Sequence, residues 1–146
     1  MIYFSADHHF GHEAIIEYCN RPFKNVAVMD KALIKNHNAI VADSDDVFFV
    51  GDFSLKTAIH KDYLRQIIGK LNGKKHLILG NHDKLNPFDY VEFGFLDVHT
   101  SLVVDDIVVV HDPACSCIDR SKLFVCGHVH DLFVMCLNVI NVSVEV

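Results

Sequence analysis

Residues 76–83 read HLILGNHD, and this stretch decides how the rest of the chain is interpreted. The apolar run up to Leu79 predicts a buried strand, and Gly80 permits a sharp turn at its end because glycine has no Cβ. Asn81 then offers an amide oxygen, His82 an imidazole, and Asp83 a carboxylate that can orient the imidazole. These are the groups that a metal-assisted hydrolase gathers in its site.

The composition is typical of one globular domain, which we expect to span residues 1–146. Hydrophobic residues make up 51% of the chain and charged residues 22%, and this length allows a sizeable core. Apolar runs stay well below the roughly 18 residues of a membrane span. Residues 1–7, MIYFSAD, do not resemble a signal peptide. These features predict a cytoplasmic protein without a membrane partner.

The formal net charge of -6 disfavours non-specific nucleic-acid binding through a broad basic surface, so we expect no stable nucleic-acid partner. A phosphate substrate is compatible with this charge, because bound cations can reverse its sign locally. The five cysteines are an odd number without regular spacing, which favours reduced thiols in a cytosol. The sequence leaves the oligomeric state open.

The first half of the chain predicts a βα pattern. Strands are expected over residues 2–6, 47–50 and 76–79. Helices are expected over about residues 13–19, 30–41 and 55–67. Asp30 and Ser54 are the expected N-caps of the second and third helices.

The second half predicts strands with little helix between them. They are expected over residues 98–104, 107–110, 123–126 and 133–146. Asp105 and Asp106 form a candidate hairpin turn. Two packed mixed sheets with helices on the outside account for both halves of the chain.

Polar side chains follow five of these predicted strands directly. Open α/β sheets place their ligand sites at the carboxyl ends of strands. The residues at these positions are Asp7 and His9, Asp52, Asn81 and His82, His111, and His128 and His130. Chance readily supplies one such placement but not five, so we expect these side chains to gather at one edge of the fold.

The same motifs, in this order and spacing, resemble the calcineurin-like metallophosphoesterases. They are Asp7-x-His9, Gly51-Asp52, Gly80-Asn81-His82-Asp83, His111 and Gly127-His128-x-His130. DHHFGH at residues 7–12 and NRPF at residues 20–23 are similar to a small bacterial and phage branch of that superfamily. The resemblance implies its αββα sandwich, an α/β fold of two mixed β-sheets flanked by helices. Two departures are Phe53-Ser54, where some relatives carry another Asp, and an end at Val146 where relatives are expected to continue.

The resemblance also implies a dinuclear metal centre. One metal would be bound by Asp7, His9 and His130, and the other by Asn81, His111 and His128, with Asp52 bridging the two. Mixed imidazole and oxygen ligands suit two divalent transition metals, Mn or else Fe, Zn, Ni or Co, better than an all-oxygen Ca or Mg site. A hydroxide that bridges the metals would attack the phosphorus atom of a phosphoester.

Two further roles follow from the resemblance. The histidine equivalent to His82 lies near the leaving oxygen as general acid or electrostatic partner, and Asp83 fixes its orientation, so both are expected to be catalytic. His12 and Arg21 are candidate substrate contacts. A role at a helix start is the alternative for His12, and a solvated charge is the alternative for Arg21.

Turn formation alone would place some of these polar residues at strand ends, where Asp, Asn and Gly are common, but it does not account for the histidines. A structural zinc site is a second alternative and would use Cys115, Cys117, Cys126 and His128. It has a tight Cys-x-Cys spacing and leaves His111 and His130 unused. Two histidines carry no ligand role: His8 is expected to pack at a strand end or to support the ligands from behind, and His37 to be a satisfied core residue.

We therefore expect a metal-dependent phosphoric ester hydrolase acting on a small molecule or nucleotide, with a phosphodiester preferred because a small chain without a large cap leaves an open cleft. A phosphomonoesterase on a nucleotide or phosphoprotein is the alternative enzyme. The alternative from another class is a non-catalytic metal-binding scaffold, as in a retromer subunit of the superfamily that lacks the catalytic histidine. The presence of His82 favours an enzyme.

Overall fold

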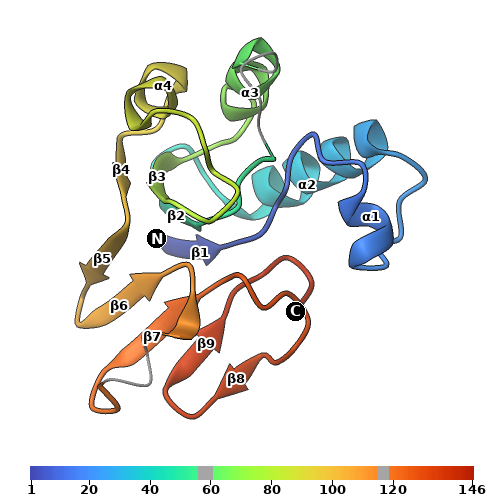
Figure 1. The fold of residues 1–146 in the computed structure, drawn as a ribbon. Helices are drawn as coiled ribbons and strands as arrows, with labels where there is room; N and C mark the ends of the chain where they lie inside the picture. Colours follow the sequence, from blue (N-terminus) through green and yellow to red (C-terminus); the bar gives the residue numbers. More distant parts are fainter. Residues whose placement is uncertain (56–60, 115–118) are drawn as a thin grey trace.

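Two β-sheets pack face to face in the computed structural model, which describes residues 1–55, 61–114 and 119–146 (Figure 1). The first sheet is parallel, with the strand order β1-β2-β3-β4. Its strands are β1 (Ile2–Ser5), β2 (Asp46–Val50), β3 (Lys74–Ile78) and β4 (Asp97–His99). Parallel neighbours need a long return connection, and each connection in this half of the chain contains a helix.

The four described helices differ in position: the last three lie on the side of the first sheet that faces away from the second sheet, and the first lies beyond the carboxyl end of β1 (Figure 1). They are α1 (Ile15–Tyr18), α2 (Val26–Ile40), α3 (Lys61–Ile68) and α4 (Pro87–Phe93). Strand β2 separates two cores, because successive side chains of a strand point to opposite faces. Val47 and Phe49 pack in the core under the helices, whereas Phe48 and Val50 pack in the core between the sheets.

The second sheet is mixed, with the strand order β5-β6-β7-β9-β8. Its strands are β5 (Ser101–Val104), β6 (Ile107–Val110), β7 (Leu123–Cys126), β8 (Met135–Cys136) and β9 (Val139–Asn141). The expected hairpin turn joins β5 to β6, with φ values of 48° at Asp105 and 70° at Asp106. Parallel pairing of β6, β7 and β9 directs their carboxyl ends toward one edge.

The α/β fold of two sheets with helices is as expected, but among the described residues helices cover only the first sheet, with α2, α3 and α4, and no described helix lies over the second. The first sheet is also parallel rather than mixed. Two residues connect β5 to β6 and two connect β8 to β9, which is too short for a helix. The outer face of the second sheet instead carries a small apolar cluster that includes Val110, Phe124 and Val139.

The expected element boundaries need two corrections, and a third expectation stays untested. Asn25 caps α2 by accepting the Val28 N–H at 3.0 Å, while Asp30 accepts hydrogen bonds from the Gly11 N–H and the Tyr63 hydroxyl. Ser54 pairs with Phe10 in an isolated bridge, and its expected role as N-cap stays a prediction, because residues 56–60 of the expected helix lie outside the described residues. The strand expected over residues 98–104 is interrupted at Thr100 and divided between the two sheets.

A short helix, α4, was not expected from the sequence. Its N-cap is Asn86, whose side chain accepts the Phe88 N–H, and Pro87 occupies the first helical turn. Gly94 follows the helix with a φ of 121°. None of the described helices combines the length and apolar character that crossing a bilayer requires.

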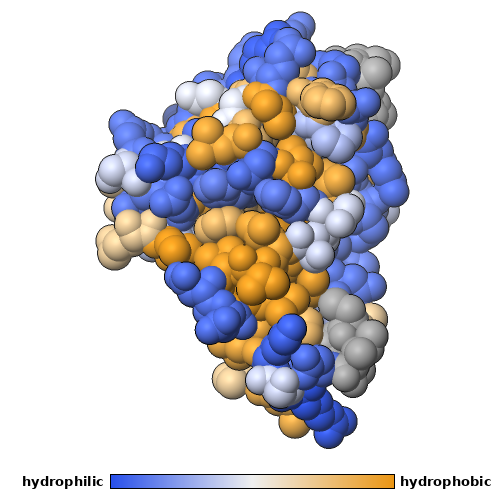
Figure 2. Space-filling model, turned by 90° about the vertical axis from the view of Figure 1, so that its left-hand side faces the viewer, coloured by the Kyte–Doolittle hydropathy of each residue, from blue (hydrophilic) through white to orange (hydrophobic). Residues whose placement is uncertain are grey.

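The side of the molecule on which β4, β5 and β6 lie exposes a broad apolar surface below a hydrophilic band (Figure 2). Val103 in β5, whose side chain is 62% exposed, is one of the large exposed hydrophobic residues of the second sheet. This side lies near the amino end of β1, so it is separate from the strand ends that carry the candidate ligands (Figure 1).

Candidate metal centre

The structure brings the seven expected ligands together at the carboxyl ends of the strands. Asp7 and His9 follow β1, Asp52 follows β2, and Asn81 follows β3. From the second sheet, His111 follows β6, and His128 and His130 follow β7. Within these loops, two groups of side chains could hold a metal ion.

The first group consists of Asp7, His9 and His130, whose ligand atoms lie within 4.8 Å of one another. The rings of His9 and His130 are stacked with their centroids 5.4 Å apart. Asp7 is fully buried, and its carboxylate accepts hydrogen bonds from the His128 N–H and the Ser143 hydroxyl. These bonds fix the carboxylate of the first sheet against two loops of the second.

The second group consists of Asp52, His111 and His128, again with ligand atoms within 4.8 Å of one another. Asn81 belongs to the same cluster, since its Oδ1 lies 3.0 Å from His111 Nε2 and 2.9 Å from His128 Nδ1. His111 Nδ1 lies 2.9 Å from the Val50 carbonyl oxygen. Because that carbonyl can only accept, Nδ1 carries a proton, and Nε2 faces Asn81 Oδ1 and Asp52 Oδ2.

Asp52 lies between the two groups. Its Oδ2 atom is 3.6 Å from His9 Nε2 and 3.4 Å from His111 Nε2. Its Oδ1 atom accepts the His82 N–H at 2.8 Å. Although burial opposes ionisation of Asp52, the hydrogen bond with His111 and the charge of that ring lower the pKa of the carboxyl below its usual value.

Left-handed backbone conformations recur at this edge of the molecule. The φ values are 58° at Asp7, 52° at His9, 49° at Asp52, 72° at His128 and 49° at His130. A residue other than glycine in this region costs on the order of 1–3 kcal/mol and persists when its surroundings hold it. Such strain is concentrated at functional sites in proteins, and here it affects five of the seven expected ligands.

Three glycines allow the loops to approach one another closely. A Cβ at Gly51 would lie 2.2 Å from His111 Nδ1, and a Cβ at Gly80 would lie 2.2 Å from the backbone nitrogen of Asp52. A Cβ at Gly127 would lie 2.6 Å from Ala6 Cβ. The Gly-Asp, Gly-Asn-His-Asp and Gly-His-x-His motifs therefore begin with glycine because the packing leaves no room for a side chain.

The donor atoms fit a metal ion. His9 is 1% exposed, and both of its ring nitrogens are buried without a hydrogen-bond partner in the described structure. A buried polar atom of this kind requires an explanation, and a bound ion is one. Burial lowers the pKa of His9 to about 3, which keeps the imidazole in the neutral form that binds metals. Imidazole and carboxylate donors together suit transition metals.

His82 lies at the open side of this cluster. Its ring centroid is 5.4 Å from that of His9, and its Nε2 is 4.0 Å from Asp52 Oδ2. The side chain is 41% exposed. The ring is thus close to both groups of ligands and also accessible to a molecule that enters the site.

The expected contact between Asp83 and the His82 ring is absent from the described hydrogen bonds. The buried Asp83 carboxylate instead accepts the N–H groups of Gly80 at 3.0 Å and of Phe53 and Ser54 at 3.4 and 3.3 Å. Burial raises the pKa of Asp83 to about 6. Asp83 therefore holds the loops after β2 and β3 together, and any effect on His82 acts through the backbone.

Arg21 is not exposed, and this corrects the expectation of a substrate contact or a solvated charge. Its side chain is 4% exposed and donates hydrogen bonds to the carbonyl oxygens of Asp7 at 2.6 Å and His8 at 2.9 Å. It also forms an ion pair with Glu145. His12 does lie near the site, since its ring centroid is 5.5 Å from that of His9.

Sequence reasoning missed three residues beside the first group of ligands. Glu145 Oε1 lies 3.2 Å from His130 Nδ1, and Cys19 Sγ lies 3.3 Å from the same nitrogen. Burial raises the pKa of the Cys19 thiol to about 11. Ser143 donates to Asp7. Cys19 and Ser143 lie more than 100 positions from the residues they contact, so local sequence patterns contain no signal for these contacts.

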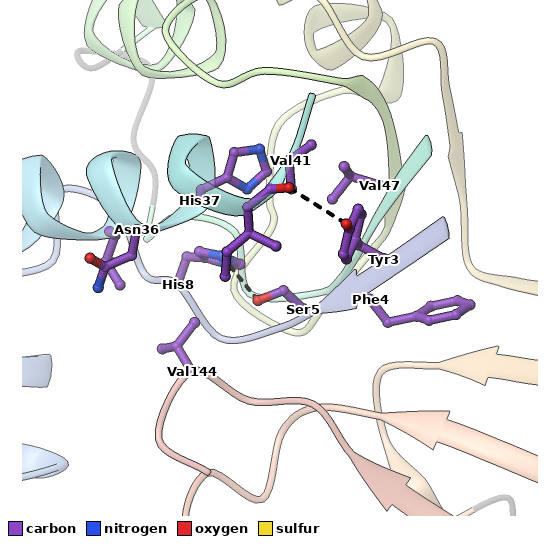
Figure 3. A pocket seen from close by; sticks show the side chains of 11 residues that line it. Tyr3, Phe4, Ser5, His8, Asn36, His37, Val41, Val47 and Val144 are labelled. Atoms are coloured by element: carbon purple, nitrogen blue, oxygen red, sulfur yellow. Dashed lines mark hydrogen bonds between the residues drawn. The ribbon is translucent and has the colours of Figure 1, made fainter. Parts of the chain in front are cut away.

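The remaining histidines that sequence analysis singled out are structural. The His8 ring stacks on Phe10 and lines a cavity of about 290 Å³ between α2 and β1 (Figure 3). Asp7 and His9 are not among the residues that line this cavity. The His8 Nε2 lies 3.3 Å from Ser5 Oγ. His37 lines the same cavity, and its Nε2 bonds to the Asn72 carbonyl at 2.9 Å. The expectations for His8 and His37 agree with these contacts.

The alternative zinc site involves residues that lie in different places. Cys115 and Cys117 lie outside the described residues. Cys126 packs with the apolar cluster on the outer face of the second sheet, whereas His128 belongs to the second group of ligands.

Comparison with known proteins shows relatives in archaea and phages. No family model matches the chain. The uncharacterized protein MJ1445 of Methanocaldococcus jannaschii is 44% identical over an alignment of 102 residues that covers 67% of this chain and 57% of that protein. The Gene 66 protein of Mycobacterium phage L5 is 32% identical over 87 residues, covering 60% of this chain and 42% of that protein. The matches thus span about half the length of these curated relatives.

Two solved structures share the fold. The protein of unknown function AQ665 from Aquifex aeolicus has a TM-score of 0.74 and 24% identity, over 99% of this chain and 90% of that chain. The nuclease MPE of Pseudomonas putida has a TM-score of 0.57 and 19% identity, over 87% of this chain and 60% of that chain. At these identities the likeness concerns the arrangement of strands and helices.

Proposed function

We propose that the chain is a phosphoesterase that uses two transition-metal ions, preferably Mn, to hydrolyse a phosphodiester. The observation that carries this proposal is the position of Asp52, whose Oδ2 lies within 3.6 Å of His9 and 3.4 Å of His111, one histidine from each group of ligands. A carboxylate shared by two cations is the arrangement that holds metals about 3.5–4 Å apart in two-metal hydrolases.

The proposed ligand assignment follows the two groups of side chains. Asp7, His9 and His130 would hold one ion, and Asn81, His111 and His128 the other, with Asp52 shared between them. Bound metals of this kind supply a nucleophile at neutral pH and neutralise charge on the phosphoryl oxygens. The resemblance of the motifs to the calcineurin-like metallophosphoesterases supports the same assignment.

His82 is the proposed proton donor to the leaving oxygen. Its imidazole is partly exposed and lies beside both groups of metal ligands. Its backbone N–H donates a hydrogen bond to Asp52, which holds the residue in place. Donation of a proton by a positioned side chain contributes about 10²–10⁴ in rate. The proposed effect of Asp83 on His82 is indirect. The Asp83 carboxylate accepts three backbone N–H groups, and these hydrogen bonds hold the loop that carries His82.

Two observations favour a diester as substrate. Asn81 and His128 are exposed and His82 is partly exposed, so the cluster is open on the side where a substituted phosphate would approach. The Pseudomonas putida neighbour is named a nuclease, and nucleases cleave phosphodiester bonds. By analogy of fold alone, this chain would act on a diester of a nucleotide or a small molecule.

The test is to measure the metal content of the purified protein together with its hydrolysis of bis-p-nitrophenyl phosphate and p-nitrophenyl phosphate. We expect about two transition metals per chain, loss of hydrolysis on chelation, recovery with Mn, and a faster rate on the diester. A large preference for the monoester would replace the diesterase by a phosphomonoesterase. Two bound metals without hydrolysis would favour the non-catalytic scaffold, and failure to bind metal after reconstitution would overturn the proposal.

A further inference from the structure

Glu145 is a buried carboxylate for which the proposed reaction has no direct use. Its side chain is 6% exposed, its Oε1 atom lies 3.2 Å from His130 Nδ1, and its Oε2 atom is buried without a hydrogen-bond partner in the described structure. A carboxylate in such a position needs a compensating charge and a reason to be retained.

Arg21 provides the compensating charge and connects Glu145 to the other side of the site. The Arg21 Nε donates to Glu145 Oε1 at 2.9 Å, and its Nη2 also contacts this oxygen. The same guanidinium donates to the carbonyl oxygens of Asp7 and His8. One buried ion pair therefore links the loop that carries Asp7 and His9 with the segment that faces His130.

We infer that Glu145 is a positioning residue for His130. Both Glu145 Oε1, at 3.2 Å, and Cys19 Sγ, at 3.3 Å, face His130 Nδ1, and a carboxylate is the stronger acceptor of its proton. A proton held there fixes the tautomer and ring orientation and leaves the Nε2 lone pair for a metal. Carboxylates that hold a metal-binding histidine in this way raise its basicity, and their removal costs about 10–100-fold in metal affinity. The inference rests on the proposed two-metal function and adds Glu145 and Arg21 to its ligand set as outer partners.

The alternative is a further metal position formed by Cys19, His130 and Glu145, whose ligand atoms also lie within 4.8 Å of one another. The guanidinium of Arg21 already contacts the Glu145 oxygen that faces His130. A cation placed there would be repelled by Arg21 across a short distance in a buried environment. The positioning role avoids this conflict, because it needs no further positive charge.

The test compares Glu145→Gln with the wild type by titrating metal-free protein with Mn and with Co. We expect one of the two ions to bind about 10–100-fold more weakly, and the other to bind within about twofold of the wild type. The visible absorption of the Co-loaded protein should change for one site and not for the other. Glu92→Gln is the matched control, since Glu92 forms an exposed ion pair with Arg65 far from the ligands, and it should change neither affinity.

A double-mutant cycle separates positioning from a general loss of structure. In a His130→Gln background, Glu145→Gln should no longer alter metal affinity, because its effect passes through the missing ring. An equal loss of affinity in both backgrounds would overturn the inference, as would wild-type affinities for both ions in Glu145→Gln.

Two further outcomes concern the alternative metal position and the proposed function. Cys19→Ser should leave both affinities unchanged. Loss of an ion in Cys19→Ser, together with a thiolate-to-cobalt charge-transfer band in the wild type, would assign a metal to Cys19 and overturn the positioning role. Fewer than two ions in the wild type would refute the proposed function itself, whereas two ions with no effect of Glu145→Gln would refute only the role of Glu145.

Discussion

The loops after the first sheet and the loops after the second sheet contribute different chemistry to the candidate metal centre. The first sheet supplies both carboxylates, and Asp7, His9 and Asp52 are all almost fully buried. The second sheet supplies imidazoles, of which His128 is exposed and His130 partly exposed. The first sheet thus supplies the negative charge together with His9 and the exposed Asn81, and the second sheet completes the ligand sets with the buried His111 and the two more accessible histidines. Metal affinity should therefore report how well the two sheets are docked.

The largest effect is expected from Asp52→Asn, which removes the carboxylate that lies between ligands of both sheets. Both ions should bind more weakly, because each loses a negatively charged neighbour. Hydrolysis should fall by at least the roughly 10²–10³-fold that follows removal of one electrostatic group from an active site. Metal content and steady-state rates check this outcome, and full occupancy of both sites would contradict the shared position of Asp52.

His82→Ala should lower the rate of hydrolysis without lowering metal affinity, although His82 lies in the same loop of the first sheet as the ligand Asn81. The variant should retain both ions, because His82 is not in either group of ligands, while hydrolysis falls by about 10²–10⁴-fold. His99→Ala is a suitable control, since His99 lies in β4 and pairs with Asp97, and its rate should match the wild type. Unchanged turnover in His82→Ala would remove this residue from the mechanism.

Gly127→Ala should weaken the docking of the two sheets. The added Cβ would meet Ala6 Cβ at 2.6 Å and Asp7 Oδ2 at 2.8 Å, so the loop after β7 must move away from the loop after β1. We expect a loss of about 1–3 kcal/mol in the free energy of unfolding, typical of overpacking, and weaker metal binding. Chemical denaturation of the metal-free protein measures the first effect.

Gly69→Ala provides the comparison for that measurement. Its Cβ would meet the Arg65 carbonyl oxygen at 3.2 Å, on the helix side of the first sheet. Its metal affinity should remain that of the wild type. If Gly127→Ala kept the wild-type free energy of unfolding and metal affinity, the loops after β1 and β7 could separate without cost. That result would contradict the expected dependence of metal binding on the docking of the two sheets.

The smallest expected effect is a change in how the free energy of unfolding depends on pH, and it arises from His37 on the helix side of the first sheet. Burial, together with the charge of Lys75, lowers the pKa of His37 below its usual value even though a bond to Asn72 opposes this. The unfolded chain therefore binds the proton more readily, and stability is lost as the pH falls through the unfolded value near 6.5. In His37→Gln, the free energy of unfolding should fall less steeply between about pH 7.5 and 5.5. Parallel pH profiles of the two metal-free proteins would contradict this.

Much of the candidate site could be predicted from the sequence because strand ends carry its residues. A short apolar run followed by Asp, His or Gly-Asn-His-Asp fixes both the strand and the edge on which its polar side chains lie. The structure places all seven expected ligands at that edge. The division into strands was also predicted in outline, including the turn at Asp105 and Asp106.

What could not be predicted depends on contacts between distant parts of the chain. Arg21 meets Glu145 across 124 positions, and such a pairing leaves no trace in local periodicity. Asp83 was expected to contact His82, but burial directs its carboxylate to backbone N–H groups that would otherwise be unsatisfied. The helix α4 did have local signals in Asn86, Pro87 and Gly94, and these could have predicted it.

The change of sheet at Thr100 limits how the molecule can move. Strand β4 pairs with β3 up to His99, and β5 pairs with β6 from Ser101 onward. The halves are also joined beside the candidate site, where the Ala6 N–H donates to the Val142 carbonyl and the Val144 N–H donates to the Ala6 carbonyl. Separating the two halves of the candidate metal centre would break these bonds, so the spacing of its ligand groups depends on them.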